Sequence, residues 1–265
     1  MEKSNDELLT VYIIESLRTK DKLTGTQLHQ ETLKHISFNI PDITSRLIPV
    51  SDKKEFFKAI DGIIEDVMSG KFAPILQIDA HGYEEGIQLS SKEIVTWVEF
   101  LNKTRELNIL LKNKLILILS LCEGNSIIGC INPEKRAPFK AIVGSFKKVY
   151  ETDLLNGLEA FYINFFSSHS IITAVQKMNE VGDVEKPIFQ LITSNECFDG
   201  MVNSNRDTIE LQRLINQIAV NEKVINQQFE GVDFCAVKQA VNMNINVIFE
   251  NINKKRDYFN MKDLS

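Results

Sequence analysis

Two short stretches of the chain each end in a side chain that can take part in covalent chemistry. Residues 74–82 read P-I-L-Q-I-D-A-H-G, and residues 114–124 read K-L-I-L-I-L-S-L-C-E-G. Each is an apolar run of strand length that stops at a reactive residue, His81 in the first and Cys122 in the second, with a glycine close behind. A cysteine thiolate is a strong nucleophile, and imidazole moves protons readily near neutral pH. The two stretches therefore offer a nucleophile and a base.

The pattern around these residues predicts that they meet at one edge of a β-sheet. Apolar runs without alternation are typical of strands that are buried on both faces. The segment between them, residues 83–113, is long enough for a crossover that contains a helix, so the two strands can run parallel. Parallel strands end at the same edge of a sheet, where ligands of open α/β sheets bind. We expect His81 and Cys122 to face one crevice.

Neighbouring residues fit the same chemistry. A glycine at position 82 lets the backbone approach a substrate, and the N–H groups of Gly82 and Cys122 could converge on its carbonyl oxygen as an oxyanion hole. Asp79 and Ser120 lie two residues before His81 and Cys122, so each shares a sheet face with its reactive neighbour. A lone cysteine is often only a small buried apolar residue, and a lone histidine at a strand end often only forms hydrogen bonds. Their joint placement favours the catalytic interpretation.

Apolar segments and helical periodicity alternate along the chain. Strands are predicted at 11–14, 47–50, 74–81, 114–122, 139–145 and 188–193. Helices are predicted at 26–35, 53–68, 154–166 and 171–179, and another is expected to start at a cap on Ser90 or Ser91 with Glu93 in its first turn. This order predicts an α/β fold with a mostly parallel sheet and helices on both faces.

Composition excludes several classes of function. The net charge of −6 argues against a protein that binds nucleic acid through general electrostatics. No apolar stretch approaches the length of about 20 residues that a membrane span requires, and the first residues lack the apolar core of a signal peptide. The four cysteines are too sparse for a disulfide framework and form no zinc motif. We expect a cytoplasmic protein, without nucleic-acid or membrane partners, in a setting that keeps a thiol reduced.

The run D-A-H-G-Y-E-E-G-I-Q-L, followed after a helical segment by L-I-L-I-L-S-L-C-E-G, resembles the caspase-like cysteine peptidases. Those enzymes carry a histidine-glycine turn, a glutamate-glycine hairpin and a cysteine at the carboxyl edge of the sheet. The likeness continues through F-K-A-I-V-G-S and A-V-Q-K-M-N, covers residues 10–195, and is greater to the bacterial CHAT-domain branch of that clan than to animal caspases.

The resemblance implies a caspase-like three-layer sandwich and a cysteine endopeptidase. It assigns His81 and Cys122 as the catalytic dyad and the amides of Gly82 and Cys122 as the oxyanion hole. It implies a protein or peptide substrate and no cofactor or metal, and it leaves room for an activating protein partner. Bacterial relatives often act in defence or regulated cell death, which is an association of the family.

The chain departs from the caspase pattern at the position of the substrate pocket. Ser120 stands where caspases have glutamine, and no arginine can be assigned to bind a P1 aspartate, the residue before the cleaved bond. The candidate substrate-binding residues are Asp79 and Ser120, with Glu15 near them. We therefore expect the pocket not to favour aspartate, and a carboxylate there would attract arginine or lysine, although a small or apolar P1 residue stays open if Asp79 is already satisfied.

Two other classes of function remain open from the sequence. One is a catalytically inactive caspase-fold module that binds or scaffolds other proteins; the presence of both dyad residues argues against it. The other is an unrelated nucleotide-binding or signalling domain, such as a TIR-like module, but no glycine-rich phosphate loop follows the first strand.

Beyond Asn203 the composition becomes polar and rich in asparagine and glutamine. We expect a peptidase domain over residues 1–203 and a helical extension over 204–265 that packs on the same domain, with helices at 208–220 and 232–253. Regulation or docking of a partner by this extension is an expectation beside the simpler one, that it covers an apolar face of the sheet.

Overall fold

The structure is a computed structural model, and it describes residues 9–122, 124, 126–145, 148–181, 187–204 and 250–264. The strands are β1 (Leu9–Ser16), β2 (Ile43–Pro49), β3 (Phe72–Tyr83), β4 (Gly86–Gln88), β5 (Ile94–Thr96), β6 (Ile116–Ser120), β7 (Ala141–Ser145) and β8 (Phe189–Thr193). The helices are α1 (Thr24–Gln27), a π-helical turn (Leu28–Leu33), α2 (Lys34–Asn39), α3 (Lys53–Met68), α4 (Trp97–Leu110), α5 (Ser126–Gly129), α6 (Glu151–Ser168), α7 (Ile171–Glu180) and α8 (Ser194–Ser204), with a 3-10 turn at Lys262–Leu264.

The main sheet has the strand order β2-β1-β3-β6-β7-β8. Strands β2, β1, β3, β6 and β7 pair in parallel, and β8 is antiparallel to β7. Each parallel pair is joined by a crossover that contains a helix, as parallel pairing requires. The predicted α/β class with a mostly parallel sheet is confirmed.

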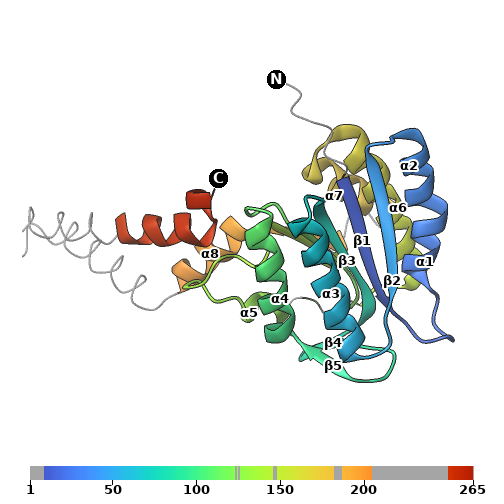
Figure 1. The fold of residues 1–265 in the computed structure, drawn as a ribbon, viewed down its shortest axis with the longest axis horizontal. Helices are drawn as coiled ribbons and strands as arrows, with labels where there is room; N and C mark the ends of the chain where they lie inside the picture. The colour runs from blue at the N-terminus through green and yellow to red at the C-terminus, as the bar shows by residue number, and fades with distance from the viewer. Residues whose placement is uncertain are drawn as a thin grey trace, which may run out of the picture.

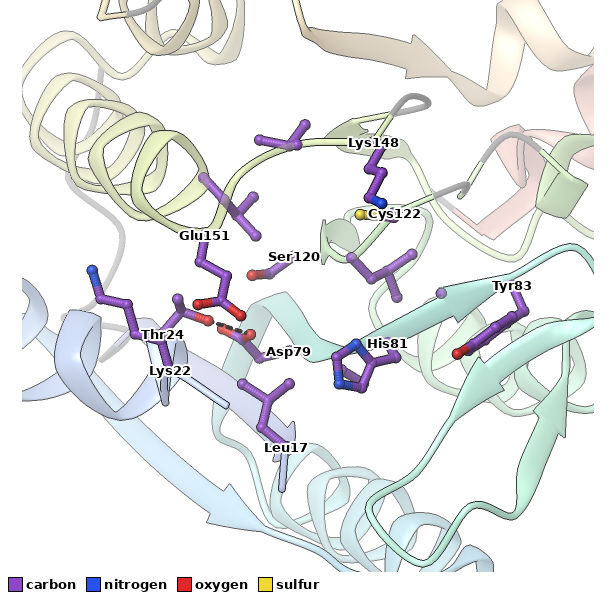
Figure 2. A pocket seen from close by; sticks show the side chains of 15 residues that line it. Leu17, Lys22, Thr24, Asp79, His81, Tyr83, Ser120, Cys122, Lys148 and Glu151 are labelled. Carbon is purple, nitrogen blue, oxygen red and sulfur yellow. Dashed lines mark hydrogen bonds between the residues drawn. The ribbon is translucent and has the colours of Figure 1, made fainter. Parts of the chain in front are cut away.

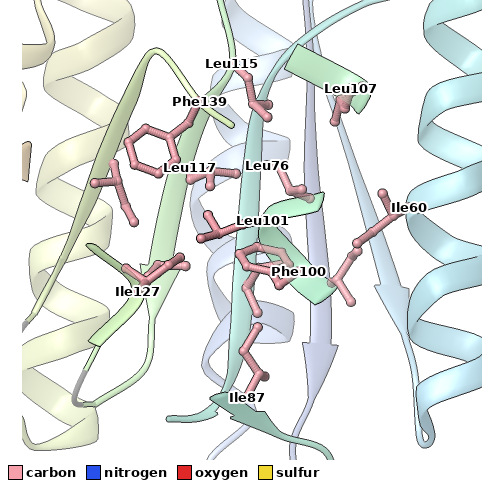
Figure 3. Close-up of a cluster of buried hydrophobic side chains, with 14 of the residues drawn as sticks. Ile60, Leu76, Ile87, Phe100, Leu101, Leu107, Leu115, Leu117, Ile127 and Phe139 are labelled. Carbon is pink, nitrogen blue, oxygen red and sulfur yellow. The ribbon is translucent and has the colours of Figure 1, made fainter. Parts of the chain in front are cut away.

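Helices cover both faces of this sheet (Figure 1). One face packs against α3 and α4, and Figure 3 shows Ile60 of α3 and Phe100 and Leu101 of α4 beside Leu76 and Leu117 of the central strands. The other face packs against α1, the π-helical turn, α6 and α7, which bury Leu28, Leu158 and Phe161. The central strands are apolar on both faces because both faces are covered. The predicted helices on both faces are therefore confirmed.

Helix α4 begins later than the sequence predicted. Residues Ile94–Thr96 form β5, which pairs with β4, so a helix capped at Ser90 or Ser91 with Glu93 in its first turn is wrong. The cap is Thr96, whose hydroxyl accepts a hydrogen bond from the backbone N–H of Glu99, while the Glu99 carboxylate accepts one from the Thr96 backbone. Ser90-x-x-Glu93 and Thr96-x-x-Glu99 both match the sequence pattern of a helix start, and the pairing of β4 with β5 decides between them.

The last described residues pack on the face of the sheet that α3 and α4 cover. Residues 250–259 are helical, and Phe259 is buried beside Phe198 of α8. The backbone N–H of Ala137 donates to the carbonyl of Phe259, and Asn113 Nδ2 donates to the carbonyl of Asn260. The predicted helix at 208–220 and most of that at 232–253 lie outside the described residues. None of the described helices is long and apolar enough to cross a membrane.

A pair of helix glycines tests how closely α6 packs on the sheet. A β-carbon on Gly157 of α6 would lie 2.7 Å from Cε2 of Phe189 in β8, whereas one on Gly62 of α3 would meet nothing within 4 Å. Gly157→Ala should therefore lower the free energy of unfolding by about 1–3 kcal/mol through overpacking. Gly62→Ala should raise it by about 0.5–1 kcal/mol, because alanine favours a helix over glycine. Urea denaturation of both variants measures this, and equal effects would contradict the close packing of α6.

Candidate active site

The carboxyl ends of four parallel strands surround one cleft. Its volume is about 330 Å³, within the range of small-ligand sites. It is lined after β1 by Leu17, Lys22 and Thr24, at the end of β3 by residues 79–83, after β6 by Ser120, Leu121 and Cys122, and after β7 by Lys148, Val149, Glu151 and Leu154. Figure 2 shows these side chains around the opening. This is the edge of the sheet where the sequence placed the reactive pair.

The register of β3 and β6 brings His81 and Cys122 to the same edge of the sheet. The two strands pair in parallel up to Asp79 opposite Ser120. Two residues further along the chain are His81, which is still in β3, and Cys122, which lies just beyond the end of β6. Both line the cleft, and Cys122 is half-buried and free of any disulfide. The Cys122 sulfur makes no hydrogen bond to His81 among the described contacts, which is common in sites without substrate.

Gly82 makes this arrangement sterically feasible. A β-carbon on Gly82 would lie 1.8 Å from the carbonyl oxygen of Cys122 and 2.6 Å from Cδ1 of Leu121. Any side chain at position 82 would therefore collide with the backbone of Cys122. The glycine after the histidine has a steric reason that is independent of catalysis, and it holds the two strand tips in contact.

A buried carboxyl lies at the inner end of the cleft. Asp79 is 1% exposed. Its Oδ1 accepts a hydrogen bond from Thr24 Oγ1 at 2.7 Å, and its Oδ2 accepts one from Gln77 Nε2 at 3.2 Å. Gln77 Oε1 in turn accepts one from the hydroxyl of Tyr162 on α6. Burial is the main cause that raises the pKa of Asp79 to about 7, and the nearby Glu15 raises it further.

Glu15 and Asp79 are neighbours at matching positions of β1 and β3. Both carboxylates approach Gly25, since a β-carbon there would lie 2.9 Å from Asp79 Oδ2 and 3.0 Å from Glu15 Oε1. Glu15 is also buried, and it accepts hydrogen bonds from the N–H and the hydroxyl of Thr26. Neutral groups donate hydrogen bonds to both acids, but no described arginine or lysine forms an ion pair with either, so neither has a counter-ion among the described residues.

Ser120 stands out because its hydroxyl is buried without a hydrogen-bond partner among the described residues. The Ser120 hydroxyl lies near the Asp79 carboxyl and favours its ionised form, but no hydrogen bond of normal geometry joins the two groups. A buried unpartnered polar group costs about 1–3 kcal/mol, and a ligand can remove that cost. The two predicted substrate-binding residues therefore lie side by side in the cleft.

Two residues that the sequence did not single out contact His81. Asp21 Oδ2 lies 2.8 Å from His81 Nε2, and Arg18 Nη2 lies 2.9 Å from the same nitrogen. Both belong to the loop after β1, 60 and more positions from His81 in the sequence. Residues 18–21, R-T-K-D, follow the first strand, and only the parallel pairing of that strand with β3 shows that they lie near His81.

The described residues do not form a site for a metal ion. They contain no group of three or more histidine, cysteine or acidic side chains placed to hold one. Comparison with known proteins finds no family model and no curated protein that matches this chain. The chemistry of the site is therefore inferred from its own residues.

The pKa of Asp79 predicts how stability depends on pH. This pKa is raised from 3.8 to about 7, so the folded chain keeps a proton that the unfolded chain has lost. The resulting contribution to stability is complete below pH 3.8 and is lost as pH rises to about 7. Asp79→Asn should remove this decline, which amounts to at most about 1.4 kcal/mol per pH unit.

Urea denaturation of both proteins between pH 4.5 and 8 measures the difference. The free energy of unfolding of the variant relative to the original chain should rise with pH over this interval. A difference that stays constant, or falls, would show that Asp79 is ionised in the folded protein throughout.

Proposed function

We propose that this chain is a cysteine endopeptidase of the caspase-like kind, with Cys122 as nucleophile and His81 as the group that moves protons. The main support is the contact between Gly82 and the Cys122 peptide, which joins the two strand tips at the mouth of the cleft. The strand order, the sheet edge that carries both residues and the two helical layers fit the sequence resemblance. The finer assignment to the caspase-like sandwich is part of the proposal.

The reaction would begin with attack of the Cys122 thiolate on the carbonyl carbon of a peptide bond. The carbonyl π electrons move to the oxygen, and the amides of Gly82 and Cys122 would stabilise this oxyanion. His81, carrying the proton taken from the thiol, gives it to the departing amine as the C–N bond breaks. This leaves a thioester on Cys122 and one free product peptide.

The second half of the reaction would release the acyl group. His81, now neutral, takes a proton from a water molecule whose oxygen attacks the thioester carbon. The tetrahedral species collapses, the C–S bond breaks, and the proton returns to the sulfur through His81. No redox partner and no cofactor enters either half.

The first test is selective labelling of the thiol. A peptidyl acyloxymethyl ketone should alkylate Cys122, as mass mapping of tryptic peptides shows. Cys197 is an internal control, because burial raises the pKa of its thiol to about 12 and so suppresses the reactive thiolate. Cys122→Ala should abolish labelling and peptide cleavage while the melting temperature stays within a few degrees.

His81→Ala should lower kcat/KM by about 100-fold or more, in line with the loss of a general acid and base. Half-buried Cys130 serves as a second control, since it lies outside the cleft lining. If the electrophile reacts with Cys130 as fast as with Cys122, or if peptide cleavage persists in Cys122→Ala, the proposed nucleophile is wrong. A folded protein that neither labels nor cleaves would favour the inactive scaffold instead.

The second test concerns the P1 side chain. Asp79 and the unpartnered Ser120 hydroxyl form the inner end of the cleft, whereas the cations Lys22 and Lys148 lie on its lining nearer the loops. A lysine or arginine at P1 would place its cation beside a carboxyl that burial leaves without a counter-ion. Peptides with P1 lysine or arginine should therefore be cleaved at least about 10-fold faster than matched P1 aspartate peptides.

The pH dependence of this preference makes the test specific to Asp79. Because burial raises the pKa of Asp79 to about 7, the ratio of kcat/KM for P1 arginine over P1 leucine should increase between pH 6 and 8. The ratio cancels any effect of pH on the dyad. It should be smaller and independent of pH in Asp79→Asn; efficient cleavage only after aspartate would refute the acidic pocket.

A further inference from the structure

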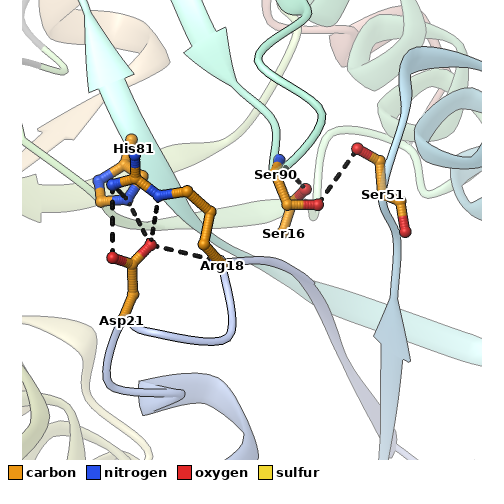
Figure 4. A network of polar contacts seen from close by, with 6 residues as sticks. All are labelled: Ser16, Arg18, Asp21, Ser51, His81 and Ser90. Carbon is orange, nitrogen blue, oxygen red and sulfur yellow. Dashed lines mark hydrogen bonds and ion pairs between the residues drawn. The ribbon is translucent and has the colours of Figure 1, made fainter.

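The loop after β1 carries an aspartate against the far side of the His81 ring. Asp21 Oδ2 lies 2.8 Å from His81 Nε2, and the Asp21 side chain is only 10% exposed. Figure 4 shows Asp21, Arg18 and His81 as one cluster. His81 lines the cleft together with Gly82 and Cys122, whereas Asp21 and Arg18 are not part of that lining. An acid that contacts one ring nitrogen can influence what the second nitrogen does.

The position of Asp21 is fixed by its own turn. The backbone N–H of Asp21 donates to the carbonyl of Arg18. Asp21 Oδ2 accepts from the backbone N–H of Arg18 at 3.1 Å and from its Nε at 2.9 Å. Just before the turn, Ser16 Oγ donates to the carbonyl of Val50 and accepts from the N–H of Ser90. The loop therefore starts from an anchored strand end and presents the carboxylate in one place.

Two hydrogen-bond patterns fit the atoms around His81 Nε2. Either Nε2 carries a proton and donates to Asp21, or it is unprotonated and accepts from Arg18 Nη2, 2.9 Å away. A neutral imidazole has one proton, so the first pattern leaves Nδ1 as a base and the second puts the proton on Nδ1. These two tautomers differ in whether the ring can accept a proton from Cys122.

The protonated His81 ring is compatible with only one of these two hydrogen-bond patterns, the one in which Nε2 donates to Asp21. In the imidazolium both nitrogens carry protons, so Nε2 can donate to Asp21 but can no longer accept from Arg18. Every proton uptake by His81 therefore strengthens the contact with Asp21 and abolishes any hydrogen bond from Arg18. A charge-assisted hydrogen bond of this kind is about twice as strong as a neutral one.

We propose that Asp21 is a positioning residue for His81, which holds the proton on Nε2 so that Nδ1 is the nitrogen that exchanges protons with Cys122 and the substrate. The proposal rests on the proposed function, because it assigns a part in the same reaction. Asp21 is not part of the cleft lining. Its effect is to select one tautomer and one orientation of the ring, and to stabilise the imidazolium that forms when the thiol ionises.

Arg18 has the separate role of keeping Asp21 charged. Its guanidinium is the largest of the influences that hold the pKa of Asp21 well below its usual range, and His81 adds to this. Asp21 is therefore an anion at any pH at which a peptidase of this kind would work. The ion pair also limits the net field on the ring, since one positive and one negative charge lie near the same nitrogen.

The test combines kinetics with the tautomer of His81. Asp21→Asn keeps the size of the side chain but replaces an acceptor-only group by an amide, and kcat/KM for a P1 lysine peptide should fall by about 100-fold or more. Asp21→Glu should restore part of the loss, because it returns the carboxylate. Asp42→Asn, which changes an exposed aspartate away from the cleft, is the matched control and should retain full activity.

Nitrogen NMR of the full chain labelled in its four histidines supplies a readout that needs no enzyme activity. His81→Ala identifies the His81 signals by their loss. In the original chain the neutral His81 ring should carry its proton on Nε2, and Asp21→Asn should shift the population toward the other tautomer. A proton on Nδ1 in the original chain would overturn the proposal, and so would unchanged activity in a folded Asp21→Asn.

These outcomes separate the inference from the proposed function. An Nε2 proton in a chain without peptidase activity would retain the pairing with Asp21 and reject the peptidase. Peptidase activity with an Nδ1 proton would retain the peptidase and reject the role of Asp21. If Asp21→Asn fails to fold, the spectrum of the original chain alone still decides the tautomer.

Discussion

The candidate site depends on the contact between two strand tips. Parallel pairing of β3 and β6 sets Asp79 opposite Ser120, and the absence of a side chain at Gly82 lets the next residues lie directly against the Cys122 peptide. The backbones of Gly82 and Cys122 are in direct contact and cannot move independently, since protein interiors are packed as densely as organic crystals. His81 and Cys122 are therefore attached to one rigid unit, while the loops after β1 and β7 complete the cleft around it.

The sheet has to bury polar groups in order to build this site. Along β3, Ile75 packs in the apolar core, whereas Gln77 and Asp79 on the same face are polar and buried, and His81 follows at the opening. A fold optimised only for stability would continue the apolar run, because burying a carboxyl costs free energy even when it is hydrogen-bonded. Tyr162 and Thr24 offset part of the cost through their hydrogen bonds to Gln77 and Asp79. The unpartnered Ser120 hydroxyl is a cost that no described residue offsets.

The sequence predicts those structural features that depend on residues close together in the chain, and it does not predict those that depend on pairing between distant segments. The helix at Lys53–Met68 has the predicted bounds, because its apolar spacing and its cap at Asp52 are both local. The central strands were predictable since burial on both faces leaves a continuous apolar run. The start of α4 was not, because Ile94–Thr96 becomes a strand only by pairing with β4. The antiparallel direction of β8 was also beyond prediction, since periodicity carries no strand direction.

The same reasoning explains why the sequence singles out His81 and Cys122 but not Asp21. His81 stands out in the sequence because an apolar strand precedes it and a glycine follows it. Cys122 ends a second apolar run, and parallel pairing brings both residues to the same edge of the sheet. Asp21 lies on a polar loop among other charged residues, and only the β1–β3 pairing carries that loop to the His81 ring. Its ion-pair partner Arg18 is three residues away in the sequence and supplies the charge that keeps it ionised. Strand pairing thus brings His81 and Cys122 to one cleft, and a loop that follows the neighbouring strand supplies the partners of the His81 ring.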